Sequence, residues 1–139
     1  MNDYGNFHDG VLEGVWVDDN TAYVFLSTLM KERFVVVADG IVALTVTNFK
    51  KGNLIFEVVA RGHEELTMDD IAALYDLREG KEGEEQAAKL LAKARQERLS
   101  ILDISPSYGA TCLLLARSIK IIDQNEWSAR YLSRATQPT

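Results

Sequence analysis

The chain has 139 residues, of which 47% are hydrophobic and 26% are charged, and its net charge is −6. This length fits one domain that buries its own core, and the composition is not that of a disordered chain. No apolar stretch approaches the roughly 20 residues that cross a bilayer. The numbers therefore argue against a disordered protein and against a membrane protein.

The acidic charge is concentrated in the first part of the chain. Residues 1–80 carry 14 acidic and 6 basic side chains, whereas residues 81–139 carry 7 acidic and 9 basic ones. A protein that binds nucleic acid needs a basic face, so we do not expect a nucleic-acid partner. An acidic field attracts a basic protein partner, and the alternative is a charge that only keeps the protein soluble.

The N-terminal segment and the single cysteine give two further expectations. The first ten residues, MNDYGNFHDG, lack the basic segment and apolar core of a secretory signal, so we expect a cytoplasmic location. The lone Cys112 lies in an apolar run and is expected to be a buried small hydrophobe, the alternative being a reactive thiol.

Five segments rich in β-forming residues fill the first sixty positions. They are 11–18, 21–29, 33–39, 41–49 and 53–60. Turn signals separate them at Asp19-Asn20, Lys31-Glu32, Asp39-Gly40 and Lys51-Gly52. Asp-Gly is a strong signal for a two-residue hairpin. The pattern predicts an α+β fold with an N-terminal five-stranded antiparallel β-meander, built as a curved sheet or a partial barrel.

The alternation of residues indicates that both faces of this sheet are covered. The first strand places Val11, Val15 and Val17 on one face and Leu12 and Trp16 on the other. The next three strands are apolar on both faces, whereas a half-solvated antiparallel sheet alternates cleanly. We expect helices, a second sheet layer or another chain to cover both faces.

Helices are predicted at about 68–77, 84–98 and 124–133, with further strands at about 99–104 and 110–122. Thr67 can cap the first helix together with Asp70, and Leu66 can pack on Ile71. Asp69 and Asp70 then read as first-turn acids favoured by the helix dipole, the alternative being a metal pair. The last helix repeats this pattern with Asp123 and Glu126, and it would bury Trp127 and Tyr131. Residues 105–109 read as the connection between the last two strands.

The sequence contains no complete catalytic or metal-binding motif. His63-Glu64-Glu65 lacks the second His of a zinc-protease helix, and one Cys cannot form a paired zinc motif. Neither a nucleophile elbow nor a phosphate loop is present. We therefore predict no catalytic residue, no metal ligand and no cofactor.

A few polar and aromatic residues remain as binding candidates. Asp9 can orient and tune the ring of His8, the alternative being a loop His with a local hydrogen bond. The Asp18-Asp19-Asn20 segment is expected to be a plain turn, because a calcium loop needs more ligands; the alternative is a weakly held cation on its oxygen atoms. A small-ligand pocket under the curved sheet would be lined at its mouth by Trp16, Tyr23 and Tyr108, with His8 or His63 nearby.

Three segments, FHDGVLEGV, LTVTNFKKGNLI and SPSYGA, carry a resemblance. They resemble landmarks of small bacterial α+β domains of unknown function, some of which are similar to the immunity proteins of toxin systems. The resemblance implies a β-meander domain and no specific residue roles.

Two hypotheses follow. The first is a non-enzymatic protein-binding module, immunity-like towards a basic protein or self-associating as a homodimer. The second is a small-ligand pocket or small enzyme that uses His8 or His63 with a nearby carboxylate.

Overall fold

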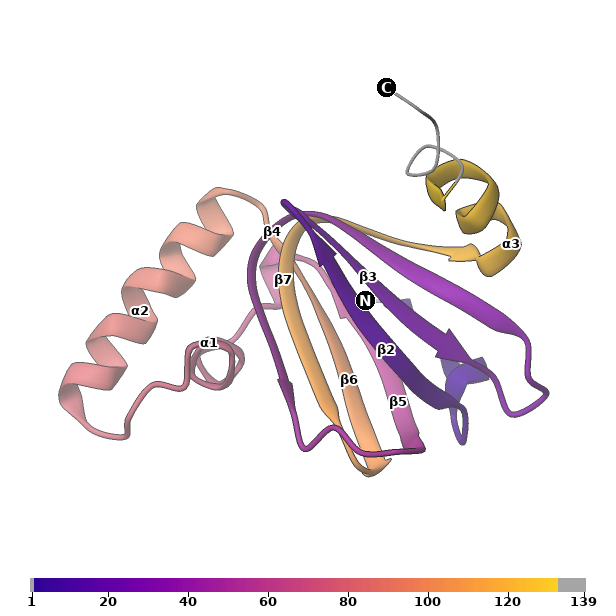
Figure 1. Cartoon of the computed structure of the whole chain (residues 1–139). Helices are drawn as coiled ribbons and strands as arrows, with labels where there is room; N and C mark the ends of the chain where they lie inside the picture. The colour runs from indigo at the N-terminus through magenta and orange to yellow at the C-terminus, as the bar shows by residue number, and fades with distance from the viewer. Residues whose placement is uncertain (1, 133–139) are drawn as a thin grey trace.

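Six antiparallel strands form a closed ring of pairings, and helices lie outside it (Figure 1). The computed structural model describes residues 2–132. The strand order is β5-β2-β3-β4-β7-β6, β6 pairs again with β5, and the short β1 adds to β5. The strands are β1 (Asn2–Asp3), β2 (Val11–Asp18), β3 (Thr21–Ser27), β4 (Arg33–Thr47), β5 (Asn53–Arg61), β6 (Ser100–Tyr108) and β7 (Thr111–Asp123). The α+β, antiparallel character is as predicted.

The helical segments lie between and after the strands. They are η1 (Gly5–Phe7), η2 (His63–Glu65), α1 (Met68–Tyr75), α2 (Lys81–Gln96), α3 (Gln124–Trp127) and the π-helical turn η3 (Ser128–Leu132). Figure 1 shows α1 and α2 on one side of the barrel and α3 on the other. Among the described residues, no helix combines the length and the apolar character that crossing a bilayer requires.

The predicted hairpin at Asp39-Gly40 is wrong. The segments 33–39 and 41–49 are not two strands, because one strand, β4, runs continuously through the glycine. Gly40 has φ +65°, and both sides of this bend pair with the long strand β7. The Asp-Gly signal is local, so it marks the positive φ correctly but does not reveal that the partner strand continues past it.

The five-stranded meander is corrected in its pairing as well. Strands β2, β3 and β4 are sequential neighbours, but β5 pairs with β2 and β6 instead of β4. The second edge of β4 is taken by β7, which pairs with it from Phe34 to Thr47. The turn at Lys51-Gly52 therefore carries the chain across the barrel.

The predicted connection at 105–109 is mostly strand, because β6 continues to Tyr108. Pro106 lies opposite Ile55, where the register of the β5–β6 pairing is irregular. A proline is tolerated at such a bulge because the regular ladder does not need its missing N–H.

The interior of the barrel is the main core. Its buried members come from all six strands and from the segments before and between them: Phe7, Leu12, Ala22, Val24, Leu26, Val36, Ala38, Ile55, Val58, Leu102, Ile104, Ala110, Cys112, Leu114 and Ala116. Val15 packs against the same core as Leu12. The predicted grouping of Val11 with Val15 is therefore wrong, since a bulge between Leu12 and Gly14 reverses the faces of β2.

Two smaller cores cover parts of the outer surface, which confirms that the sheet is apolar on both faces. Helices α1 and α2 pack on β6, β7 and the second half of β4 through residues such as Ile71, Leu91 and Leu115. Trp127 of α3 packs on Val35 and Val37 of β4.

The helix caps follow the prediction in part. Thr67 and Asp70 form the complete capping box, and Leu66 and Ile71 share one core. Asp123 accepts a hydrogen bond from the Asn125 amide, but Glu126 pairs with Arg130 at 2.9 Å instead of closing a box. The predicted end of this helix at residue 133 lies outside the described residues.

Candidate functional site

Buried side chains of the described residues fill the barrel interior. The fifteen core residues expose at most 2% of their surface, and they pack on each other. Side chains of this size fill the inside of a small barrel. The clefts that the described residues form lie on the outside of the barrel.

The two histidines lie in separate places. The His8 Nδ1 atom is 2.8 Å from the Phe56 carbonyl oxygen, and its Nε2 atom is 3.7 Å from the Asp9 carboxylate. His63 lies in η2 beyond the end of β5, with its ring 3.8 Å from Glu64. Phe56 and His63 are seven residues apart, about 20 Å along an extended chain. The histidines do not converge on a common carboxylate.

Trp16 and Tyr23 come together, but away from Tyr108. Their ring centroids are 5.2 Å apart, and both rings contact Trp127 of α3. Burial raises the pKa of the Tyr23 hydroxyl, and Tyr131, Asp18 and Asp39 raise it further. Tyr108 is exposed at the end of β6 opposite Leu54. The predicted pocket mouth is therefore divided between an aromatic cluster under α3 and a distant strand end.

The strongest ionic cluster joins the barrel to α1. Arg61 of β5 donates two hydrogen bonds to the Asp70 carboxylate, at 2.8 and 2.6 Å, and lies 3.7 Å from Asp103. Burial raises the pKa of Asp103, although Arg61 partly offsets it. This cluster positions a helix, and the described residues place no nucleophile in it.

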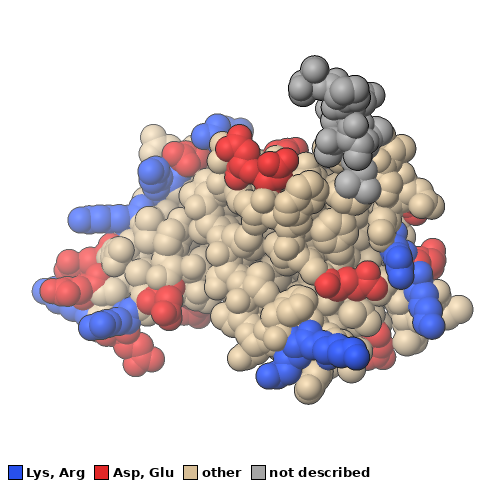
Figure 2. All heavy atoms as spheres, viewed as in Figure 1, with Lys and Arg blue, Asp and Glu red and all other residues tan. Residues whose placement is uncertain are grey.

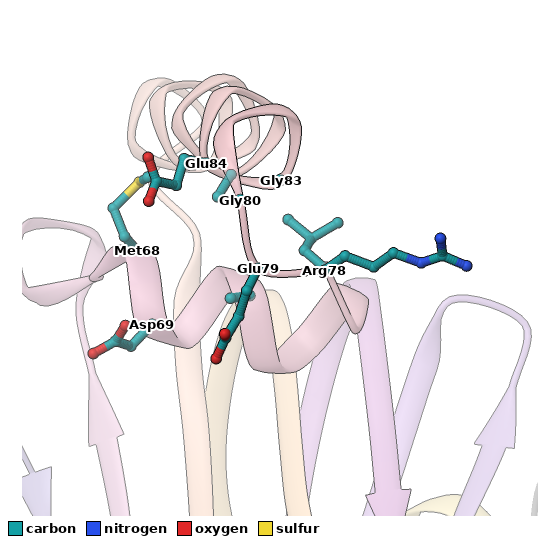
Figure 3. Close-up of a pocket in the computed structure, with 10 residues that line it drawn as sticks. Met68, Asp69, Arg78, Glu79, Gly80, Gly83 and Glu84 are labelled. Atoms are coloured by element: carbon teal, nitrogen blue, oxygen red, sulfur yellow. The ribbon is translucent and has the colours of Figure 1, made fainter.

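Figure 3 shows the cleft between α1 and the first turn of α2. It has a volume of about 410 Å³, and Arg78 points away from it. Its charged lining is mainly acidic, from Asp69, Glu79 and Glu84. The lining contains no His, Cys, Ser or Thr, so it provides no nucleophile with a base.

One buried side chain, that of Asn53, joins three segments at the seam of the barrel, where β2 meets β5. Only Val11 and Leu12 of β2 pair with β5, opposite Leu54 and Asn53. The Asn53 amide group donates hydrogen bonds to the carbonyls of Leu12 and Lys50, at 3.3 and 2.7 Å. Its oxygen accepts hydrogen bonds from the amides of Lys50 and Ala110. Asn53 thus ties β2, the β4–β5 loop and the β6–β7 turn together.

Two glycines allow the chain to approach closely at this closure. A Cβ atom on Gly10 would lie 2.1 Å from the Ser27 carbonyl oxygen, and one on Gly109 would lie 2.4 Å from the Asn53 oxygen. Phe7 is buried in the barrel core beside them.

An apolar surface, which we call the seam patch, lies on the outside of the seam. It consists of Val11, Leu29, Leu54, Phe56 and Tyr108. Val11 and Tyr108 flank Leu54 on the neighbouring strands, and Val11, Leu29 and Leu54 line one shallow cleft of about 470 Å³. All except the half-buried Val11 are exposed. Of these residues, only Tyr108 was predicted to line a binding site. The run Leu54-Ile55-Phe56 was the available signal, since it is apolar on both faces.

Charges of both signs border the seam patch. Asp9, Glu13, Lys31 and Arg33 line the same cleft as Leu54. Of these four, only Asp9 takes part in an ion pair that the structure describes, and that pair is with His8. The seam patch is thus an apolar centre with a rim of both acidic and basic groups.

The chain matches no protein-family model, and no curated protein or solved structure is significantly similar to it.

Proposed function

We propose that this chain is a non-catalytic protein-binding module and that the seam patch is the surface through which two copies associate. The observation that carries the proposal is the seam patch, which neither helical layer covers. Its exposed side chains present on the order of 400 Å², which is typical of the interaction surfaces of monomers. The filled interior and the separated histidines give the rival small-ligand or enzyme hypothesis no support.

The rim charges favour a second copy as the occupant. In a two-fold dimer the same patch meets itself, so acidic residues on one copy can face basic residues on the other. Glu13, Lys31 and Arg33 supply both signs. Apolar core and charged rim together approach the roughly 800 Å² per partner that a stable interface buries.

The test is the mass in solution as a function of concentration. We expect sedimentation of the unchanged protein to show a dimer that grows with micromolar concentration. Leu54→Glu places a charge at the centre of the seam patch and is expected to give a monomer. Val42→Glu is the matched control, since Val42 is similarly exposed but lies beside α2, and it is expected to dimerise. A strict monomer at every concentration would refute self-association.

The immunity-like form of the hypothesis, in which a basic protein is the partner, has separate support in the acidic first half of the chain. Such a complex weakens as salt rises, because its charges attract over about 10 Å at moderate ionic strength.

A further inference from the structure

We infer that the free edge of β2 binds an extended segment of a partner protein, which adds to the barrel as a strand and carries apolar residues flanked by Lys or Arg. The inference deepens the proposed function and rests on it only in taking the chain to be a binding module. It concerns a surface other than the seam patch.

Most of β2 has a neighbour on one side only. It pairs with β3 along its whole length, from Val11 to Asp18. On its other side it pairs with β5 at Val11 and Leu12, and no strand in residues 2–132 pairs with residues 13–18 there. An edge of this kind leaves N–H and C=O groups available to another chain.

The geometry of the β2–β3 hairpin indicates which groups are available. Asp18 and Thr21 lie opposite each other across a two-residue turn, so they form a hydrogen-bonded pair. Such pairs alternate along an antiparallel ladder with pairs that are not hydrogen-bonded. The N–H and C=O groups of Val15 and Val17 therefore point to the free side.

The side chains along this edge favour an apolar partner. Val17 and Trp16 are exposed, with 45% and 42% of their surfaces accessible. Successive side chains of a strand point to opposite faces, so these two project on either side of the sheet. A strand added beside them covers both when it carries apolar residues on both faces.

The ends of the same edge are acidic. Glu13 lies at one end and Asp18 and Asp19 at the other. Figure 2 shows acidic side chains gathered above the β2–β3 hairpin tip, while most of the surface below them carries no charge. The effect of Asp18 and Asp39 on the pKa of Tyr23 is consistent with a negative potential here.

These charges favour a different chain over a second copy. In an antiparallel pairing of two β2 edges, Glu13 of one copy would lie beside the Asp18-Asp19 turn of the other. Like charges at adjacent cross-strand positions destabilise a sheet. A strand with basic residues at both ends meets the acids with opposite charge instead.

The free edge and the seam patch meet only at Glu13, which lies on the rim of the patch. Val17 is six residues from Val11, about 20 Å along the strand. Leu54→Glu, which disrupts the seam patch, should therefore leave binding at the edge unchanged.

The experiment uses a peptide of about ten residues with a centre of Val and Ile, which is apolar on both faces, and two Lys at each end. We expect binding with a Kd below about 1 mM, and a version with Glu at the ends should bind at least tenfold more weakly. Hydrogen exchange of the amides should slow at Val15 and Val17. No binding, equal binding of the two peptides, or protection confined to other strands would overturn the inference.

Two variants test the mode of binding. Val17→Pro removes an N–H from the free side, where an edge strand tolerates proline, and should weaken binding roughly tenfold. Val17→Thr keeps the N–H and the branched shape, and should bind as the unchanged protein does. Tight binding by a folded Val17→Pro protein would overturn the inference.

A charge exchange decides the question even if the proline variant does not fold. Asp18→Lys should weaken the Lys-flanked peptide and strengthen the Glu-flanked one, whereas an unchanged preference would overturn the inference. The same titrations on Leu54→Glu separate the two proposals. If this variant loses the dimer but still binds the peptide, the seam patch mediates self-association and the β2 edge binds the peptide independently.

Discussion

At the residue scale, Asn53 shows how one amide side chain closes a barrel. It makes four hydrogen bonds to the backbone, and its own surface is almost fully buried. Asn53→Ala would leave the Leu12 carbonyl and the Ala110 amide without these partners. We expect a loss of about 2–4 kcal/mol in the free energy of unfolding, measured by urea denaturation. Asn6→Ala, at an exposed position on η1, is the control and should change stability little.

Asp70 makes a second residue-scale prediction, which concerns pH. Burial alone would raise the pKa of Asp70, but hydrogen bonds from Arg61 and Thr67 outweigh it and lower the pKa. Ionised Asp70 therefore stabilises the folded state above the ordinary Asp pKa of about 3.9, and this stability is lost as the pH falls towards the lowered value. Asp70→Asn should cost about 2–3 kcal/mol at pH 7. It should also remove part of the decline in stability below about pH 4.

The pKa of Asp103, in the same cluster, is shifted in the opposite direction from that of Asp70, so Asp103 serves as the comparison. Its pKa is raised, so its contribution to stability falls as the pH rises from about 3.9 through that raised value. Stability curves of Asp70→Asn and Asp103→Asn against pH should therefore diverge from the unchanged protein in opposite directions. Parallel curves would show that the cluster of Arg61, Asp70 and Asp103 does not govern the change in stability at low pH.

At the element scale, α3 is attached to the barrel mainly through Trp127. The ring lies within 5.0–6.3 Å of the rings of Phe25, Tyr23 and Trp16, measured between centroids. We expect Trp127→Ala to cost about 3 kcal/mol, because a buried aromatic ring is removed. Near-ultraviolet circular dichroism should lose the signal of the cluster. Trp16→Ala, at a half-exposed position in the same cluster, should cost less than half as much.

The elements also show what local sequence signals contain. Strand β2 was predicted with its observed limits, and the cap at Thr67 was predicted with its partner, because both depend on neighbouring residues. The bend at Gly40 and the course of β5 were not predicted. They depend on β7 and β6, which come at least forty residues later in the chain. Pairing over such distances leaves no periodic signal in either strand.

At the scale of the whole molecule, the candidate sites depend on long-range strand pairing, which local sequence signals do not contain. Trp16, Tyr23 and Tyr108 were predicted to line one pocket mouth, but Tyr23 is buried in the cluster with Trp127, and Tyr108 is exposed at the end of β6. The seam patch was not predicted because Leu54 and Phe56 read as members of a covered face. Because β5 crosses to pair with β2, Leu54 and Phe56 lie outside the two cores that the described helices form with the barrel.

The hydrogen bond from Ala110 to Asn53 has a consequence for synthesis. The closure needs residues from four parts of the chain, and the last of them, Ala110, follows roughly four-fifths of the sequence. Until β7 is added, a nascent chain holds β2, β3 and β4 without the strand that joins β4 to β6 and completes the ring. Domains of this kind expose apolar surface while they wait for distant strands. We therefore expect the growing chain to depend on chaperone protection longest at its first three strands.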